Sequence, residues 1–302
     1  PMETDRAGDE GSPLSFTLSV LDIPGATVET FHPKAVHLYG NTLYVANDAP
    51  GHYSLEVFDV SSGNVRHVKS MVEWMNGDKK ETFAGEPNGV TRSYGKIYVT
   101  NTGSRTDVFD AETYEFITCI GTGTWGEGGY QTVHAFDVTA SQGAVFIRDK
   151  RKLVVVLEQD VQPGSAARVP IYSRSVNLQE AMGTYAVAAR NDGFLYVTAQ
   201  NKNMIYLFDP ADIRAGDTGF APYLVTLGFE KSPQSIAFVG DRLFVTLRVD
   251  DKRSELWEIS PKNGKLLQDF TDSMVYPEKI AGARHTLLVV DRATQTVKAI
   301  GL

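Results

Sequence analysis

Cysteine is almost absent from this 302-residue chain, which contains only Cys119. A single cysteine excludes an internal disulfide. Its neighbours Phe116, Ile117 and Ile120 form an apolar, strand-like stretch, so we predict that Cys119 is a buried core residue rather than a reactive thiol. A large domain with its own core folds without disulfides in any compartment, so this scarcity does not decide the location of the protein.

Positive charge is also scarce, because 29 Lys and Arg residues stand against 37 Asp and Glu residues, for a net charge of -8. This balance excludes a basic nucleic-acid binder. No apolar run approaches the roughly 18 residues that a membrane-spanning helix needs. With 42% hydrophobic and 22% charged residues, the chain has the composition of an ordinary globular protein.

The common signatures of metal, nucleophile and phosphate chemistry are missing as well. No HExxH or CxxC spacing occurs, and neither a nucleophile elbow nor a phosphate-binding loop is found. The stretch Gly121–Gly126 matches a dinucleotide-binding glycine pattern, but Glu127-Gly128-Gly129 follows it instead of a helix. The sequence therefore names neither a ligand nor a reaction.

A short pattern that is present six times predicts the fold. It consists of a turn followed by a three-residue strand centre, in which the first and third residues are aliphatic and the middle residue is aromatic or leucine. The copies recur at intervals of 44 to 54 residues. The middle residues of the six copies are Tyr44, Tyr98, Phe146, Tyr196, Phe244 and Leu288. This period is typical of the blades of a β-propeller.

Each copy is accompanied by further strand-like segments in a constant order. A shorter apolar segment, often opened by proline, precedes the strand centre, and a third strand ending in aromatic-Asp follows it, as in Phe58-Asp59 and Phe109-Asp110. A turn and an outer strand, such as 265–270, complete the unit. Four short antiparallel strands per unit make one blade.

The sixth unit ends at Leu302 without an outer strand, and the strand-like run 16–23 can supply it. We therefore predict an all-β, six-bladed propeller spanning residues 16–302, closed by pairing of the N-terminal strand with the last blade. An open array or a seven-bladed ring with a cryptic unit is the alternative. Residues 1–15 are expected to form a flexible polar leader.

The copies Asn41-Thr42-Leu43-Tyr44-Val45-Ala46-Asn47 and Lys96-Ile97-Tyr98-Val99-Thr100-Asn101 resemble the NHL and YVTN-type β-propeller repeats. The resemblance covers nearly all of residues 16–302 and implies a propeller fold. Propellers of this type include lyases, lactonases, dehydrogenase subunits and binding modules, so the resemblance implies no single function.

The loops that enter the inner strands are expected to surround one end of the central channel, which is the default binding face. One polar residue per blade precedes each inner strand there: Lys34, Asn88, His134, Tyr185, Gln234 and Glu278. All six side chains can form hydrogen bonds. Arg148 and Arg248, which follow central strands, add charge to the same face. The ring is a candidate ligand site, although channels are often wet and polar without binding anything.

Three blade-entry loops are longer than the repeat requires: 70–85, 121–131 and 173–183. Two of them carry Trp74, Trp125 and Tyr130. These aromatic rings are candidates for stacking on a sugar or another flat ligand, and the alternative is that they fill gaps between blades.

Lactonases that resemble this class hold a divalent metal with Glu, Asn and Asp side chains in the channel. Glu86, Asn88 and Asn201 are the candidate ligands here, and the fourth, Asp149 or Asp291, would come from a different register. Propeller lyases use a channel histidine as acid or base, which makes His134 the candidate catalytic residue.

From these patterns we expect a binding or scaffolding module for a small molecule, glycan or protein partner. A metal-assisted hydrolase or a His-dependent lyase is the alternative. We expect the protein to be periplasmic, at the cell surface or secreted, with possible anchoring through the N-terminal leader.

Overall fold

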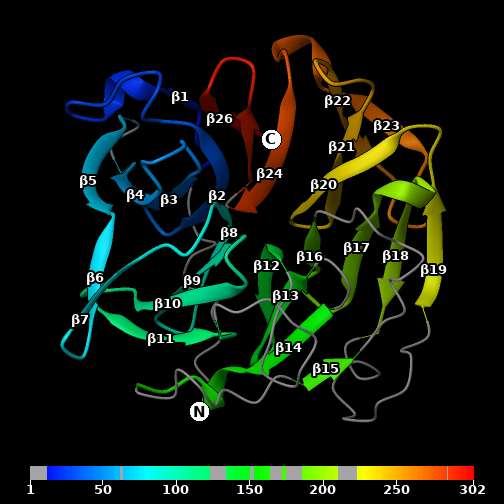
Figure 1. The fold of residues 1–302 in the computed structure, drawn as a ribbon. Helices are drawn as coiled ribbons and strands as arrows, with labels where there is room; N and C mark the ends of the chain where they lie inside the picture. Colours follow the sequence, from blue (N-terminus) through cyan, green and yellow to red (C-terminus); the bar gives the residue numbers. More distant parts are fainter. Residues whose placement is uncertain are drawn as a thin grey trace.

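The computed structural model describes residues 12–61, 64–122, 134–149, 153–163, 172–174, 186–209, 223–283 and 285–302. Six four-stranded antiparallel sheets stand around a central axis, each sheet forming one blade (Figure 1). The inner strand of every blade contacts the inner strands of the blades before and after it, so the ring is closed. The predicted six-bladed propeller is therefore confirmed.

The strands of each blade follow one another from the channel outward. The inner strands are β2 (Pro33–Tyr39), β8 (Pro87–Ser93), β12 (Ala135–Ser141), β16 (Val187–Ala189), β20 (Ser232–Val239) and β24 (Pro277–Ala283). The second strands are β3 (Thr42–Asn47), β9 (Lys96–Asn101), β13 (Ala144–Asp149), β17 (Leu195–Ala199), β21 (Arg242–Arg248) and β25 (Thr286–Asp291).

The two remaining positions of each blade lie farther from the axis. The third strands are β4 (Ser54–Asp59), β10 (Arg105–Asp110), β14 (Leu153–Leu157), β18 (Met204–Phe208), β22 (Ser254–Ile259) and β26 (Thr296–Gly301). The outer strands are β5 (Arg66–Met71), β11 (Phe116–Ile120), β15 (Tyr172–Arg174), β19 (Tyr223–Gly228), β23 (Leu266–Asp269) and β1 (Phe16–Leu18).

Short elements connect these strands. They are the hairpin of β6 (Glu73–Asn76) and β7 (Lys79–Thr82) and the 3-10 turns η2 (Val20–Asp22), η3 (Glu158–Asp160), η5 (Gln200–Lys202) and η6 (Thr271–Ser273). Within the described ranges, no helix is long and apolar enough to cross a membrane.

Strand β1 closes the ring by pairing with β26, with Phe16 opposite Ala299 and Leu18 opposite Val297. Leu18 is fully buried. The closing strand is shorter than the predicted run 16–23, because the backbone N–H of Ser19 donates to Asp22 Oδ2 at 2.8 Å and begins the turn η2. Ring closure thus leaves no unpaired strand edge at the junction of the last blade.

The repeated middle residue of the second strand explains the sequence period. Each of these six side chains is at most 1% exposed, and each belongs to an apolar cluster that joins one blade to the next. Tyr44, for example, packs with Val90 and Ile97 of the second blade. The pattern repeats because every inter-blade space needs one large apolar side chain.

Cys119 lies on β11 and is buried, as predicted. Burial raises the pKa of its thiol to about 11, and the neighbouring Asp107 carboxylate acts in the same direction. The cysteine is therefore an unreactive core residue.

Candidate channel-mouth site

Five of the six inner strands begin with a β-bulge. In the first blade Pro33 pairs with Asn47 and Ala35 pairs with Ala46, so Lys34 is an extra residue without a partner in the ladder. The corresponding extra residues of the other strands are Asn88, Phe136, Gln234 and Glu278. A bulge re-aims its side chain away from the regular sheet. All five of these side chains line one cavity at the end of the channel.

We name this space the mouth cavity, and its volume is about 520 Å³. The second, fourth, fifth and sixth blades contribute further residues to the wall besides the five bulge residues. The lining residues are Lys34, Glu86, Asn88, Thr102, Phe136, Gln200, Gln234, Arg248, Asp251, Tyr276, Glu278, Lys279 and Arg292.

Of the predicted polar ring, Lys34, Asn88, Gln234 and Glu278 line the mouth cavity, and His134 does not. His134 is half-buried, makes an edge-on ring contact with Phe136 at 6.0 Å between centroids, and is not among the residues that line the cavity. The bulge residue of the third blade is Phe136, two positions later. This inner strand lacks the opening proline that marks most of the others. Tyr185 lies outside the described residues.

The mouth cavity contains a three-membered ion-pair network. Lys34 Nζ lies 2.9 Å from Glu278 Oε1, and Arg292 Nη1 lies 3.2 Å from the same oxygen. Burial of Glu278 favours its neutral form, but the charges of Lys34 and Arg292 outweigh this effect and hold the pKa of Glu278 below its ordinary value of 4.5. Glu278 is therefore a carboxylate at neutral pH.

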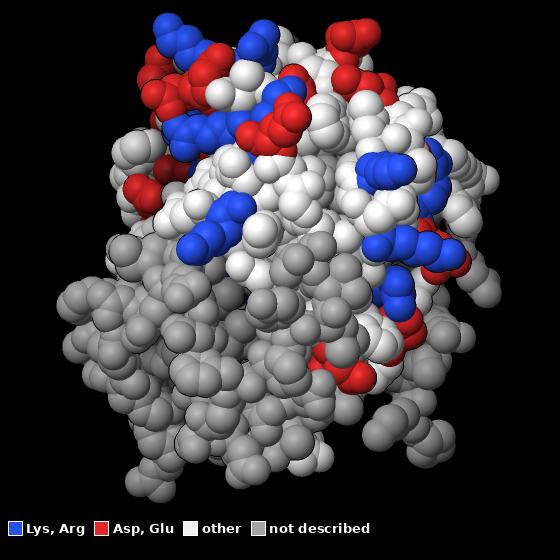
Figure 2. All heavy atoms as spheres, turned by 90° about the vertical axis from the view of Figure 1, so that its right-hand side faces the viewer, with Lys and Arg blue, Asp and Glu red and all other residues white. Residues whose placement is uncertain are grey.

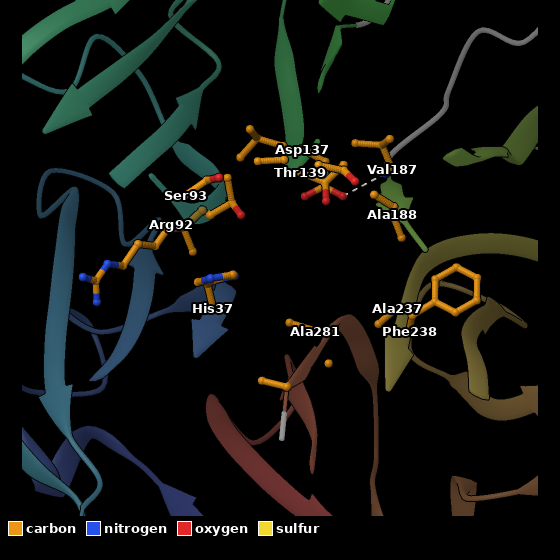
Figure 3. Close-up of a pocket in the computed structure, with 18 of the residues that line it drawn as sticks. His37, Arg92, Ser93, Asp137, Thr139, Val187, Ala188, Ala237, Phe238 and Ala281 are labelled. Atoms are coloured by element: carbon orange, nitrogen blue, oxygen red, sulfur yellow. Dashed lines mark hydrogen bonds between the residues drawn. The ribbon is translucent and has the colours of Figure 1, made fainter. Parts of the chain in front are cut away.

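The floor of the mouth cavity is an ion pair between opposite blades. Lys279 Nζ of the sixth blade lies 3.1 Å from Asp137 Oδ1 of the third, and both side chains are largely buried. Asp137 Oδ2 also accepts the backbone N–H of Val187 at 3.0 Å, the bond drawn as a dashed line in Figure 3. Burial raises the pKa of Asp137 and lowers that of Lys279, and each charge opposes the shift of the other.

Small residues make room for this floor. Asp137 and Lys279 occupy the position that follows each bulge, where the first, second and fifth blades have Ala35, Gly89 and Ser235. A Cβ atom on Gly89 would lie 2.9 Å from Asp137 Cα and 3.1 Å from its Oδ1. Glycine is therefore required where the second blade faces the carboxylate.

Three buried polar atoms at the mouth cavity have no hydrogen-bond partner: Asn88 Nδ2, Gln234 Oε1 and Glu278 Oε2. Asn88 is 5% exposed and Gln234 is 8% exposed. The Gln234 amide donates a long hydrogen bond of 3.4 Å from Nε2 to the Tyr276 hydroxyl. A buried polar atom left unsatisfied costs about 1–3 kcal/mol, so these groups are available to a ligand at a stability cost to the free protein.

The two predicted arginines have different positions. Arg248 lines the mouth cavity and pairs with Asp251. Arg148 is wholly buried, does not line the cavity, and donates to the backbone carbonyl of Asp149. Burial lowers the pKa of Arg148 to about 9, an effect that Asp149 opposes. The prediction of Arg148 as a ligand-binding residue is therefore not supported by its position.

Two of the three candidate metal ligands, Glu86 and Asn88, line the mouth cavity. The third, Asn201, is exposed on η5 and is not a lining residue. Asp291 accepts the backbone N–H groups of Val275 and Tyr276 and braces the blade-entry loop. Among the residues that the structure describes, no three His, Cys, Asp or Glu side chains stand close enough to share a metal ion.

Trp74 fills space between β-strands at the periphery and does not reach the channel. It lies on the β6–β7 hairpin, is 8% exposed, and packs edge-on against Phe83 and Phe109, each 4.9 Å away between ring centroids. Phe116 stacks on it at 5.8 Å. Trp74 therefore has the gap-filling position given as the alternative, and it does not line the mouth cavity. Trp125 and Tyr130 lie outside the described residues.

A second space of about 500 Å³, the opposite cavity, lies at the other end of the channel. The distal halves of the inner strands line it, including His37, Ser93 and Thr139 (Figure 3). Arg92 points away from this cavity in Figure 3, and its guanidinium lies 3.9 Å from the centroid of the Tyr39 ring.

Sequence reasoning missed Phe136, Lys279 and the contact of Asp137 with Lys279. One signal could have found Phe136. Each bulge residue stands two positions before the first β-branched residue of its inner strand: Val36, Val90, Val138, Ile236 and Ile280. Alignment on that residue places Phe136, not His134, in the ring.

The outer surface carries charges of both signs. On the side shown in Figure 2, Lys and Arg spheres lie among Asp and Glu spheres, and the described residues there form no broad patch of one sign. This surface does not favour a highly charged partner.

Comparison with known proteins supports the fold. No family model matches the chain, and no curated protein matches it. Among solved structures, virginiamycin B lyase from Staphylococcus aureus is similar with a TM-score of 0.60 and 12% identity, over 95% of this chain and 99% of that one. The β-propeller domain of Myceliophteria thermophila Cps50 (Swd1) has a TM-score of 0.58 and 12% identity, over 92% and 99%.

A 6-phosphogluconolactonase-like protein from Bacteroides fragilis has a TM-score of 0.56 and 15% identity, over 88% of this chain and 79% of that one. The class that these similarities and the six blades define is the β-propeller. At identities of 12–15% the similarities establish this fold and carry no activity over to the chain.

Proposed function

We propose that this β-propeller is a binding module that holds a small polar molecule in the mouth cavity. The observation that carries the proposal is that the buried amides of Asn88 and Gln234, on bulges that face the same space, each have one atom without a hydrogen-bond partner, Asn88 Nδ2 and Gln234 Oε1. A ligand that supplies their hydrogen bonds removes the penalty that these groups impose on the free protein.

The shape of the site favours a small molecule over a protein or a long glycan. A volume of about 520 Å³ lies within the range of roughly 300–1,000 Å³ that is common for small-molecule sites. Lys279 lines this space and its partner Asp137 lines the opposite cavity, so their ion pair lies between the two. A protein partner would contact the rim rather than the buried amides.

The metal-assisted hydrolase is the second candidate, because Glu86 and Asn88 both line the cavity. Carboxylate and amide oxygens suit a hard divalent cation. The lyase hypothesis has less support, since His134 does not line the cavity. The location outside the cytoplasm stays a prediction, which fractionation of cells that produce this protein will test.

Thermal unfolding tests the proposal, because a ligand that binds only the native state raises the melting temperature. The full chain is screened against polar small molecules and, separately, against calcium, magnesium, manganese and zinc. We expect a small-molecule shift that disappears in Asn88→Ala and Gln234→Ala. The exposed residues Asn64 and Gln268 provide matched controls, and Asn64→Ala and Gln268→Ala should retain the shift.

Three other outcomes have distinct meanings. A shift with a metal alone that is lost in Glu86→Gln would move the assignment to the metal-dependent enzyme. A shift that persists in both amide variants would place the ligand elsewhere. No shift with any compound or metal would contradict small-molecule binding and leave a protein partner as the function to seek.

A further inference from the structure

The cations of the mouth cavity are each engaged by a carboxylate. Lys34 and Arg292 contact Glu278, Lys279 contacts Asp137, and Arg248 contacts Asp251. A ligand anion would have to compete with these carboxylates for every cation. The cavity therefore offers little to a carboxylate or phosphate group.

The hydrogen-bond acceptors of the cavity, in contrast to its cations, include buried atoms without a partner. Glu278 Oε2 and Gln234 Oε1 are buried and have no partner. Glu86 lines the same space at its solvent-exposed rim and forms no ion pair within the described parts of the chain. Only one lining donor, Asn88 Nδ2, is buried without a partner. The cavity thus has a surplus of acceptors and one carboxylate without a counter-charge.

A further carboxylate adds to the negative potential beside Lys34. Burial raises the pKa of Asp48, Lys34 lowers it, and the charges of Glu278 and Glu86 raise it again. Asp48 thus lies within range of the charges of Lys34, Glu278 and Glu86. Glu278 is already paired with Lys34 and Arg292, so within the described residues Glu86 is the lining carboxylate that a cationic group of a ligand can pair with.

Resting on the proposed function, we propose that the ligand of the mouth cavity carries a protonated amine on a hydroxyl-bearing body, as an amino sugar or amino polyol does. The ammonium group lies against Glu86 and Glu278. Hydroxyl groups donate to Gln234 Oε1 and accept from Asn88 Nδ2, and the Phe136 side chain forms an apolar wall for the carbon skeleton.

Compounds matched in shape and different in charge test this inference. Calorimetric titrations of the full chain compare D-glucosamine with D-glucose, N-acetyl-D-glucosamine and D-gluconate, and 1-amino-1-deoxysorbitol with sorbitol. We expect each amine to bind up to about fivefold more tightly than its neutral counterpart, because an ion pair with an exposed carboxylate such as Glu86 is worth about 0.2–1 kcal/mol. D-Gluconate should bind weakest.

Two variants test whether Glu86 causes the preference for an amine over a neutral compound. In Glu86→Gln the ratio of amine to neutral affinity should fall towards one while the neutral compounds bind as before, which also shows that the variant is folded. Glu115 is exposed on the β10–β11 turn, and Glu115→Gln should leave the ratio unchanged.

The remaining outcomes separate the two proposals. Equal affinity for amines and neutral compounds, or tighter binding of D-gluconate, would overturn the amine inference and leave small-molecule binding intact. An amine preference that survives Glu86→Gln would also overturn it. Failure of every compound to bind would count against the proposed function itself.

Discussion

The two ends of the channel are built from the same six inner strands and differ in how those strands meet the space. The mouth cavity and the opposite cavity have similar volumes, about 520 and 500 Å³. At the mouth, bulges turn five side chains inward, and three buried polar atoms lack partners. At the opposite end the register is regular and Arg190 is paired with Asp192.

Arg92 Nε is the one buried unpartnered side-chain atom among the described residues that line the opposite cavity, and its guanidinium stacks on Tyr39 away from that space. The proposed site thus lies at the end of the channel where the regular strand pairing is interrupted by bulges. Regular strand pairing satisfies its own polar groups, whereas a bulge leaves a side chain that can serve a ligand.

The largest effect is expected from breaking the floor ion pair, which lies between the two cavities. Lys279→Met leaves the Asp137 carboxylate buried without its cation, which costs about 3–5 kcal/mol in the free energy of unfolding. The double variant Asp137→Asn, Lys279→Met should recover most of that loss. Denaturant unfolding measures both, and a cost below about 1 kcal/mol for the single variant would show that the pair is not a structural floor.

A smaller loss is expected from crowding the floor. Gly89→Ala places a Cβ atom 2.9 Å from Asp137 Cα, and overpacking of this kind costs about 1–3 kcal/mol. Gly228→Ala is the matched control, because nothing lies within 4 Å of its added Cβ. Equal stability of the two variants would contradict the close approach of the second and third blades.

The ion pairs of the mouth predict a pH dependence on the order of 1 kcal/mol. Because the folded-state pKa of Glu278 is lowered, its stabilising contribution is present above its ordinary pKa of 4.5 and is lost as pH falls through the folded value. Between pH 5 and pH 3 the wild type should therefore lose more stability than Glu278→Gln. Parallel loss in both proteins, measured by denaturant unfolding, would contradict the network.

The smallest effect on stability, and the sharpest contrast between the two ends, is expected for Gln234→Met. This change removes an unpartnered buried acceptor at nearly constant shape, so the free protein should be as stable as the wild type or more stable by about 1 kcal/mol. Thermal unfolding without and with the ligand measures this. Clear destabilisation would mean that the amide is satisfied within the protein.

Much of the fold could be predicted from the sequence because each blade repeats one packing requirement. The six residues from Tyr44 to Leu288 occupy equivalent inter-blade spaces, and equivalent spaces select similar side chains. The mouth ring could be predicted only where proline marks the start of an inner strand. The inner strand of the third blade has no opening proline, so the sequence pattern favours His134 although the bulge residue is Phe136.

The floor could not be predicted, because Asp137 and Lys279 are far apart in the chain and meet only across the closed ring. Nothing in the local sequence of either strand specifies the other. Trp74 illustrates a different limit. Its loop is longer than the repeat requires, but only the folded hairpin shows that the indole packs against Phe83 and Phe109.

The most direct test of the account is a crystal structure of the protein soaked with the compound that gives the largest thermal shift. If the mouth cavity is the binding site, electron density for that compound lies against Asn88, Gln234 and Glu278, and the opposite cavity contains none. Density in the opposite cavity, or at a surface remote from both, would contradict the claim that the bulged end of the channel is the binding site.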